Sequence, residues 1–267
     1  MSVLVFTIFY LVMFVIAMVF SAMGVGGGVL YTPVQILFGF HFQTAAATSL
    51  FLIMVTSLSA TLVFRKAGVV DWPMALVLES STTLGAFLGG LFSGHFSGRS
   101  LTYLFAGVIT FAAFFMVKHF ETPDRCAGLP SSFFRWRREI GVETYCVNLA
   151  VALPIAFIAG VTSGLIGVSG GILKVPILVL LFGVPMNIAV GSSAFMVGLT
   201  ASGGFLGHLA AGHFDWRVAI ILVPGIFLGG QIGARASVKV DKAKMKRFFG
   251  YVLFALAIFL VIHTALH

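Results

Sequence analysis

Long apolar runs alternate with short polar stretches along the whole chain. Two shorter apolar pieces, 29–40 and 172–183, each follow a cluster of glycines and are too short to cross a bilayer as straight helices. The pattern therefore predicts an all-α membrane protein whose short pieces are half-helices, re-entrant segments or parts of broken helices. The runs long enough to span the hydrocarbon core, at about 20 residues each, are 3–23, 43–64, 72–94, 101–119, 145–166, 187–208, 216–236 and 248–265.

The second half of the chain repeats the first. The glycine-rich stretch 24–33 recurs as 167–176, and after a one-residue insertion the copies stay in register through Asp71-Trp72 and Asp215-Trp216. A paired Asp-Trp at matching places argues against chance similarity between two Gly-rich apolar segments, and it indicates an internal duplication. The predicted organisation is a first transmembrane repeat over 1–119, a polar basic connector over 120–144 and a second transmembrane repeat over 145–267.

Composition agrees with this membrane assignment. Of the 267 residues, 60% are hydrophobic and only 9% are charged, whereas about a quarter of an ordinary soluble domain is charged. A soluble enzyme and a nucleic-acid-binding protein are therefore excluded, and the lipid bilayer is the expected environment. The two cysteines, Cys126 and Cys146, fit no metal-binding or redox spacing and do not by themselves indicate a disulfide. No cofactor and no metal site is predicted.

The positions of lysine and arginine indicate how the segments are oriented. If the two short pieces do not change sides, the 16 Lys and Arg divide evenly across the membrane. If each piece carries the chain across, all but Arg99, Lys174 and Arg217 lie on one side. Basic residues in short loops favour the cytoplasm, so the second arrangement is expected. Each repeat then has an odd number of segments, the repeats are inverted, the connector is cytoplasmic and both ends of the chain face outside.

The two glycine clusters are the main candidates for a binding site. Inverted repeats with interrupted helices are typical of secondary transporters that bind substrate near the bilayer midplane. A helix that begins after such a cluster would direct free backbone N–H groups and its positive dipole end at an anion, without any arginine. The alternative is close helix packing through small residues. The cluster residues proposed to bind substrate are Gly26, Gly27, Gly28, Ser169, Gly170 and Gly171.

Hydroxyl groups follow each cluster at matching positions. Thr48 and Ser49 in the first repeat correspond to Ser192 and Ser193 in the second. Because these residues lie near helix starts and are related by the repeat, all four could donate to the same anion. Their alternative role is a hydrogen bond to a carbonyl one turn back in the helix.

Few ionisable residues lie inside the apolar segments. Lys174, in the second short piece, could bind an anion or extend to the interface. Glu79, inside the run 72–94, could carry a proton for coupling or pair with a nearby base. His208 is the second candidate for coupling, because histidine titrates near neutral pH. Asp71 and Asp215 are expected to cap helix N-termini, with the tryptophan after each at the membrane interface.

In their order and duplication, these features resemble the TauE/SafE family of sulfite exporters. The residues that carry the resemblance are the two glycine clusters, each followed by Pro33 or Pro176, the paired hydroxyl residues, and the segment 207–216. The resemblance implies a protein of a bacterial inner membrane, so the outward-facing termini expected from the lysine and arginine positions would be periplasmic. It also implies export of a small anion such as sulfite or an organosulfonate, driven by an ion gradient. Binding at the repeat interface with alternating access is expected from the interrupted, inverted repeats. The resemblance leaves the oligomeric state open.

Three other functions remain open at this point. An anion channel would also use helix N-termini. A rhomboid-like intramembrane serine protease would use Ser169 as nucleophile within a Gly-x-Ser-Gly pattern and His208 as base. However, the first repeat keeps the same turn with Gly26 in place of the serine, which favours a backbone role. The third alternative is a scaffold or assembly subunit.

Overall fold

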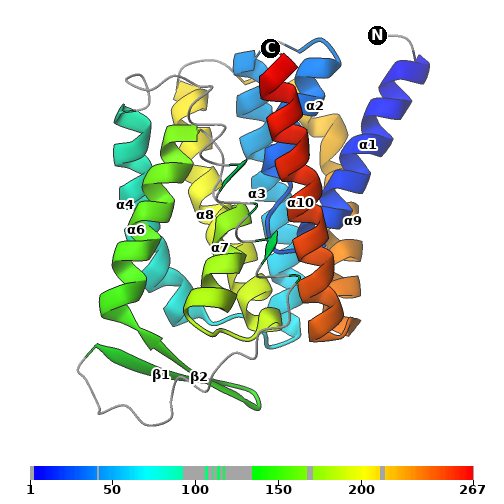
Figure 1. Ribbon diagram of the computed structural model, residues 1–267. Helices are drawn as coiled ribbons and strands as arrows, with labels where there is room; N and C mark the ends of the chain where they lie inside the picture. The colour runs from blue at the N-terminus through cyan, green and yellow to red at the C-terminus, as the bar shows by residue number, and fades with distance from the viewer. Residues whose placement is uncertain are drawn as a thin grey trace. The chain divides into compact units, whose positions relative to one another are not determined.

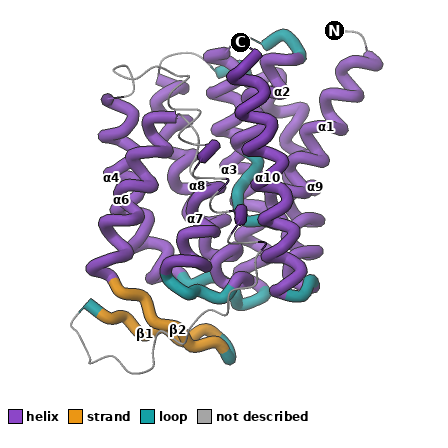
Figure 2. Tube along the Cα trace, in the orientation of Figure 1, coloured by secondary structure: helices purple, strands orange, loops and turns teal. Residues whose placement is uncertain are grey.

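The computed structural model describes residues 3–40, 42–92, 106–107, 110, 113–114, 117, 134–166, 171–210 and 214–266. These residues are mostly helical, as predicted (Figures 1 and 2). They form two compact units, and each unit combines segments of both sequence halves. Unit 1 comprises 1–70 and 190–239, and unit 2 comprises 71–189 and 240–267.

Unit 1 is built around three helices that run in the same direction. Along α1 and α9, Gly225, Gly229 and Gly233 lie in turn against Tyr10, Phe14 and Met18, so these two helices are parallel (Figure 1). Along α3 and α9, the ring of Phe51 lies 6.0 Å from that of Trp216 and Ser59 Oγ donates to Phe227 O at 2.6 Å, which gives the same direction. The helices of this unit are α1 (Val3–Ala22), α2 (Gly28–Leu37), α3 (Phe42–Lys66), most of α8 (Met186–Ala210) and α9 (Trp216–Lys239).

The short helix α2 runs opposite to α3. The Tyr31 hydroxyl lies 2.9 Å from Thr56 Oγ1, whereas Gln35, one turn further along α2, donates from Nε2 to Ser49 Oγ at 2.7 Å. Since α1 and α3 are parallel, α2 returns the chain toward the end at which α1 began. This direction agrees with the arrangement favoured by the lysine and arginine positions. A full crossing of the bilayer by α2 stays a prediction.

Unit 2 is built around a second parallel helix pair, α4 and α6. Ser81 Oγ donates to Leu153 O at 2.8 Å, and one turn later Gly85 lies against Phe157 (Figure 1). The elements of this unit are α4 (Trp72–Phe92), β1 (Arg135–Ile140), β2 (Glu143–Asn148), α6 (Leu149–Ile166), α7 (Gly171–Pro176), the π-helix η2 (Ile177–Leu181), the first residues of α8, and α10 (Lys242–Leu266).

The helix pairs α1–α9 and α4–α6 are held by repeat-related contacts. A side chain added at Gly229 would meet Phe14 O at 2.8 Å and Met18 N at 3.4 Å. In α4 and α6, Gly85 meets the same atoms of the counterpart residues Phe157 and Val161. Each pair therefore joins one helix from the first sequence half to one from the second. The inverted orientation of the two repeats stays a prediction.

A β-hairpin forms where the sequence predicts connector and helix. β1 and β2 are antiparallel, with Arg135 opposite Asn148 (Figure 2). The predicted start of a helix at 145 is therefore wrong, because residues 143–148 pair with β1 and α6 begins only at Leu149. Tyr145 and Val147 are buried on one face of β2, so the strand shows the alternation typical of a half-buried strand. The predicted segment 101–119 lies largely outside the described residues.

Four described helices are long and apolar enough to cross a membrane by length and composition. The spans lie in Val3–Ala22, Ala47–Lys66, Met186–Leu206 and Trp216–Lys239. They overlap four of the predicted runs, 3–23, 43–64, 187–208 and 216–236. The remaining predicted crossings stay predictions.

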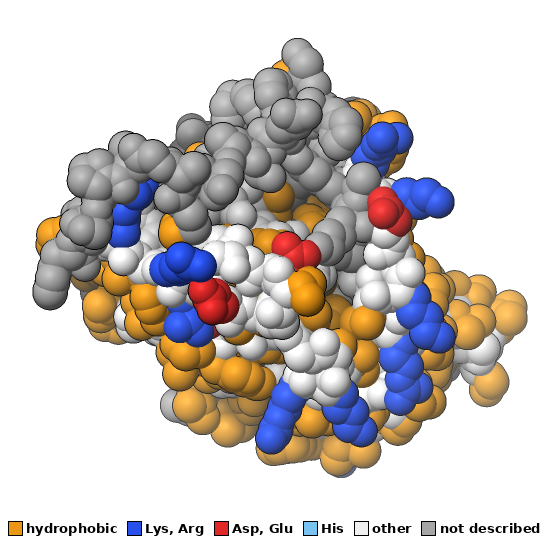
Figure 3. Space-filling view, turned by 90° about the horizontal axis from the view of Figure 1, so that it is seen from below, with side chains coloured by type: hydrophobic (Ala, Val, Ile, Leu, Met, Phe, Trp, Pro, Cys, Tyr) orange, Lys and Arg blue, Asp and Glu red, His pale blue; other side chains and the backbone are white. Residues whose placement is uncertain are grey.

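Basic residues gather at one end of each unit. In unit 1, the parallel helices α3 and α9 place Arg65, Lys66, Arg235 and Lys239 at one end, whereas Arg217 begins α9 at the other. In unit 2, α4, α6 and α10 all begin at the end that carries the hairpin (Figure 1). Seen from that end, Lys and Arg side chains gather beside a few carboxylates (Figure 3). That the basic ends of both units face the same side of the membrane stays a prediction.

The hairpin also contains a disulfide-bonded cysteine. Cys146, on β2, is disulfide-bonded, which the sequence did not predict. Cys126, the other cysteine of the chain, lies outside the described residues. Disulfides persist in oxidising compartments, whereas the arginines of β1 favour the cytoplasm. The two features therefore point to opposite sides of the membrane.

Candidate functional site

The first glycine cluster forms a tight backbone bend in unit 1. Gly24, Gly26 and Gly27 have φ angles of 70°, 75° and 79°, a region that side chains disfavour. Gly27 precedes α2 as its N-cap and makes no side-chain cap hydrogen bond. A side chain at Gly26 would meet Ser57 Oγ at 3.0 Å and Val197 Cγ1 at 2.9 Å. The bend therefore packs directly on α3 and α8. The same glycines both allow close helix packing and precede the start of α2.

Two of the predicted hydroxyl residues are used to hold this bend and α2. Ser193 Oγ donates to Gly24 O at 3.0 Å, and Ser49 Oγ accepts from Gln35 Nε2 at 2.7 Å. Ser192 is fully buried on α8. Thr48 Oγ1 is buried and has no hydrogen-bond partner among the described residues. Of the four predicted residues, Thr48 is thus the one with an unused hydroxyl.

Ser57 is a polar residue that the sequence analysis missed. It is 1% exposed, and its Oγ has no hydrogen-bond partner in the described part of the chain. Its hydroxyl lies against the backbone of Gly26, as the contact above shows. Its counterpart in the second repeat is Ala201, so a search for repeated polar residues passes over it. Its position inside an apolar run was the available signal.

A cavity of about 380 Å³ lies between α3 and α8 in unit 1. It is lined by counterpart residues of the two repeats, among them Phe51 with Phe195 and Val55 with Leu199. Ser57 belongs both to this lining and to the contact with the glycine bend. The full lining is Phe51, Met54, Val55, Ser57, Leu58, Thr61, Phe195, Gly198, Leu199 and Ser202. The cavity is mainly apolar, with Ser57 next to the start of α2.

In unit 2, the two ionisable candidates form a buried ion pair. Lys174 Nζ, on α7, lies 2.7 Å from Glu79 Oε2, on α4, and the two side chains are 4% and 5% exposed. Thr83 Oγ1, one turn further along α4, donates to the other carboxylate oxygen at 3.3 Å. Lys174 therefore does not extend to the interface, and Glu79 pairs with a base, which was one of the two roles open to it.

The remaining candidates of the second repeat are only partly described. Gly171 begins α7, which continues through Pro176 into the π-helix η2. Ser169 and Gly170 lie outside the described residues. His208 lies on α8, and only its backbone is described.

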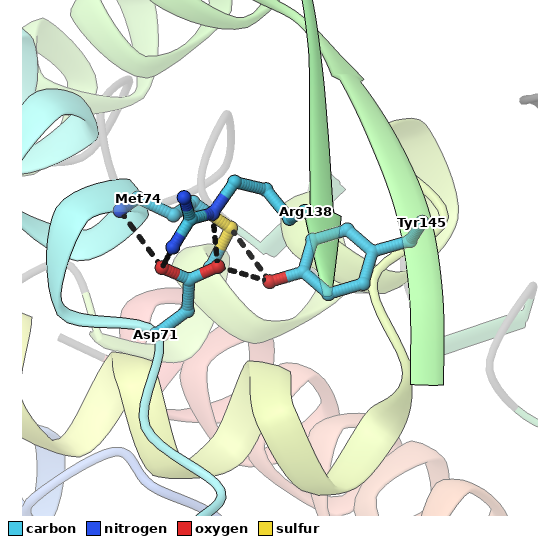
Figure 4. Close-up of polar contacts among 4 residues, drawn as sticks. All are labelled: Asp71, Met74, Arg138 and Tyr145. Carbon is cyan, nitrogen blue, oxygen red and sulfur yellow. Dashed lines mark hydrogen bonds and ion pairs between the residues drawn. The ribbon is translucent and has the colours of Figure 1, made fainter. Parts of the chain in front are cut away.

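Asp71 does more than cap α4 (Figure 4). Its Oδ1 accepts from Met74 N at 3.1 Å, the predicted N-cap bond. The Arg138 guanidinium also donates to both carboxylate oxygens, at 2.7 and 2.8 Å, and the Tyr145 hydroxyl donates to Oδ2 at 2.6 Å. Asp71 is fully buried. The cluster fastens the hairpin to the start of α4, a contact that spacing along the sequence does not show.

Electrostatics at this cluster favour the charged carboxylate. Burial acts to raise the pKa of Asp71, but hydrogen bonds from Arg138, Tyr145 and the Met74 amide outweigh it, so the pKa lies below its ordinary value. The hydrogen bond to Asp71 raises the pKa of Arg138 in turn. Burial, followed by the hydrogen bond to Asp71, raises the pKa of the Tyr145 hydroxyl. Asp71 is therefore ionised at neutral pH.

Long apolar helices, short helices, a glycine bend before α2 and polar groups buried among them define a multi-pass membrane protein of the transporter class. Comparison with known proteins agrees, since the family model described as "Sulfite exporter TauE/SafE" matches residues 9–260. The chain belongs to this family. Its members are membrane transporters and not enzymes, so the protease alternative based on Ser169 is excluded.

Relatives of similar length carry transporter names. The chain is 32% identical over 233 residues to the "Probable membrane transporter protein YunE" of Bacillus subtilis, covering 83% of this chain and 84% of the relative. It is 26% identical over 243 residues to a "Probable membrane transporter protein" of Xylella fastidiosa, covering 90% and 88%. It is 22% identical to one from Methanocaldococcus jannaschii, covering 93% and 92%. No solved structure matches the chain.

Proposed function

We propose that this transporter exports small sulfur-containing anions, such as sulfite or organosulfonates, across a bacterial inner membrane. The anion binds near the midplane in the cavity between α3 and α8, next to the glycine bend. Access alternates between the two sides and is coupled to an ion gradient, with Glu79 and His208 as the candidate coupling residues. The family description "Sulfite exporter TauE/SafE" supports the substrate class.

The observation that carries this proposal is the unused hydroxyl of Ser57 beside the start of α2. A buried polar atom without a partner is costly unless a ligand or water satisfies it. The first N–H groups of a helix also lack partners inside the helix, and the dipole there favours negative charge. A small anion at this place would accept hydrogen bonds from Ser57 and from the bend of Gly26, Gly27 and Gly28. Thr48 is a further hydroxyl available on α3.

Flux measurements test the function itself. Purified protein in proteoliposomes is expected to transport labelled sulfite and a sulfonate such as isethionate with saturation, because a carrier must bind each anion in turn. Imposing a proton gradient is expected to change the accumulated amount. Nonsaturating flux that ignores the gradient would favour the channel instead, and an absence of anion flux would refute the substrate class.

Two serine variants test the site. Ser57→Ala is expected to raise the KM for the transported anion about tenfold or more, since a hydrogen bond to a charged group contributes about 1.5 to 3 kcal/mol. Ser202→Ala is the matched control, because Ser202 also lines the cavity but already donates to Gly198 O at 2.7 Å. Equal KM values for the two variants would place the anion elsewhere.

Fusions to the end of the chain test the orientation. With a cytoplasmic connector and an odd number of crossings after it, alkaline phosphatase fused after His267 is expected to be active, and green fluorescent protein at the same place is expected to be dark. The reverse result would place the hairpin on the oxidising side, in agreement with the disulfide at Cys146 and against the basic residues.

A further inference from the structure

The ion pair between Lys174 and Glu79 lies in unit 2 and joins two apolar segments, in which an unpaired charge would be costly. The two side chains come from α7 and α4, they are almost completely buried, and their charged atoms are 2.7 Å apart. Ionisable groups inside membrane segments are expensive and tend to mark substrate or ion pathways. Each charge is tolerated here because the other compensates it.

The repeat-related positions show that the fold does not require this charge pair. The counterpart of Lys174 is Tyr31 on the short helix α2. Its hydroxyl forms a neutral hydrogen bond with Thr56 Oγ1 on α3 at 2.9 Å. The counterpart of Glu79 is Val223. The charges, one from each repeat, are therefore present at one of two repeat-related places, and the residues at the other place are neutral.

The residues around the Lys174 ammonium leave it with one negatively charged partner at a time. On α4, α6, α7 and η2, Glu79 and Lys174 are the only titratable side chains in the described residues, and Thr83 is the polar neighbour on the carboxylate. If Glu79 gains a proton, Lys174 is left with an uncompensated positive charge. A substrate anion is the group that can replace the lost negative charge.

We propose that the Glu79 carboxylate and the substrate anion compete for the Lys174 ammonium, which forms a second anion site, in unit 2, besides the cavity of unit 1. A proton on Glu79 decides which of the two occupies it. A proton from solution adds to a carboxylate oxygen of Glu79, the ion pair with Lys174 opens, and the anion takes its place. On release, the anion leaves, the proton returns to solution and the ion pair closes. The inference rests on the proposed function, since it assumes that the substrate is a small anion.

This exchange fixes the coupling ratio. The closed pair is neutral, and the loaded site, with a neutral acid, an ammonium and a monovalent anion, is neutral as well. One proton therefore moves with each monovalent anion in the same direction, and membrane potential does not drive the step. The net direction follows from the anion gradient together with the pH gradient, so a sufficient outward anion gradient gives export.

Glu79→Gln tests the exchange. The assay uses proteoliposomes, equal pH on both sides, labelled isethionate and a trapped pH dye; a sulfonate stays ionised through the neutral range, so the substrate itself does not titrate. Wild-type flux is expected to fall as pH rises, by up to tenfold per pH unit, because each unit lowers the proton concentration tenfold. In Glu79→Gln the flux is expected to become independent of pH, and the dye is expected to report no proton movement. Glu139→Gln, an exposed site on β1, makes the same chemical change and is expected to behave as wild type.

Two further variants separate this exchange from a purely structural ion pair. Lys174→Gln is expected to reduce flux at least tenfold at every pH. The double variant Glu79→Gln/Lys174→Gln restores neutrality, so it is expected to elute as a single species in size-exclusion chromatography and still to lack flux. Wild-type KM in the double variant, or wild-type pH dependence in Glu79→Gln, would overturn the inference. A wild-type protein that moves no anion at any pH would instead refute the proposed function.

Discussion

Replacing Asp71 with alanine is expected to lower the stability of the protein by about 3 to 5 kcal/mol, the cost of removing one partner of a buried ion pair. The carboxylate is fully buried and receives both donors of Arg138 and the hydroxyl of Tyr145. Without it, the guanidinium, whose side chain is only 19% exposed, keeps its charge and loses its acceptor. The measurement is the melting temperature in detergent, followed by dye binding or by loss of the monodisperse peak.

The repeat provides a matched control for this prediction. Asp215, the counterpart of Asp71, caps α9 through a hydrogen bond from Arg217 N at 2.9 Å and lies at a partly exposed position. Asp215→Ala is therefore expected to cost about 1 kcal/mol, the usual contribution of an N-cap. Equal melting-temperature losses for Asp71→Ala and Asp215→Ala would show that the cap, and not the hairpin contact, accounts for the effect.

The same cluster predicts a direction for the pH dependence of stability. The pKa of Asp71 lies below its ordinary value of 3.8 in the folded protein. A carboxyl with a lowered pKa stabilises the folded state above the unfolded pKa, and this contribution is lost as the pH falls through the folded pKa. Wild type is therefore expected to lose stability below about pH 4 more steeply than Asp71→Asn, which keeps a capping side chain without the charge.

A second large loss is expected from adding side chains where helices meet through glycine. In Gly85→Ala, the new Cβ would run into the backbone carbonyl of Phe157, and in Gly233→Ala into that of Met18. A rigid carbonyl cannot rotate away as a side chain can, so the helices must separate. We expect a cost at or above the upper end of the about 1 to 3 kcal/mol that overpacking usually causes.

The control for this prediction is Gly203→Ala on α8, where no atom of the described residues lies within 4 Å of the added atom. Alanine favours helix over glycine by about 1 kcal/mol, so this variant is expected to be neutral or slightly stabilising. Melting temperatures of the three variants are compared under one condition. If all three shift alike, the close approach of the helix pairs α4–α6 and α1–α9 is wrong.

Local patterns predicted much of the fold. Apolar runs located the long helices within a few residues, and the first glycine cluster located the bend before α2, because each signal lies in consecutive residues. The hairpin at 135–148 was missed because only Asn148 separates the apolar residues of β2 from those of α6. Its alternation of buried and exposed positions covers only a few residues, and the apolar run concealed it.

The candidate site was predicted less completely, because its contacts join distant residues. Lys174 and Glu79 were singled out separately, but only the packing of α7 near α4 brings them into contact, across 95 positions. The hydrogen bond from Ser193 to Gly24 spans 169 positions and is equally invisible to spacing. Ser57 was passed over because its counterpart is Ala201. Symmetry between the repeats predicted the course of the backbone well. It did not predict side chains such as Ser57, which differ from their counterparts in the other repeat.

The way the helices are shared has a consequence for how such a protein can arise. α1 packs on α9 and α6 packs on α4, so neither half of the sequence contains the partner of its own first helix. A half-length polypeptide folding by the same contacts would have to exchange its first helix with that of a second molecule. The ancestor of a duplicated gene of this kind would thus have worked as an intertwined pair, and fusion would have turned an exchange between two chains into an exchange within one.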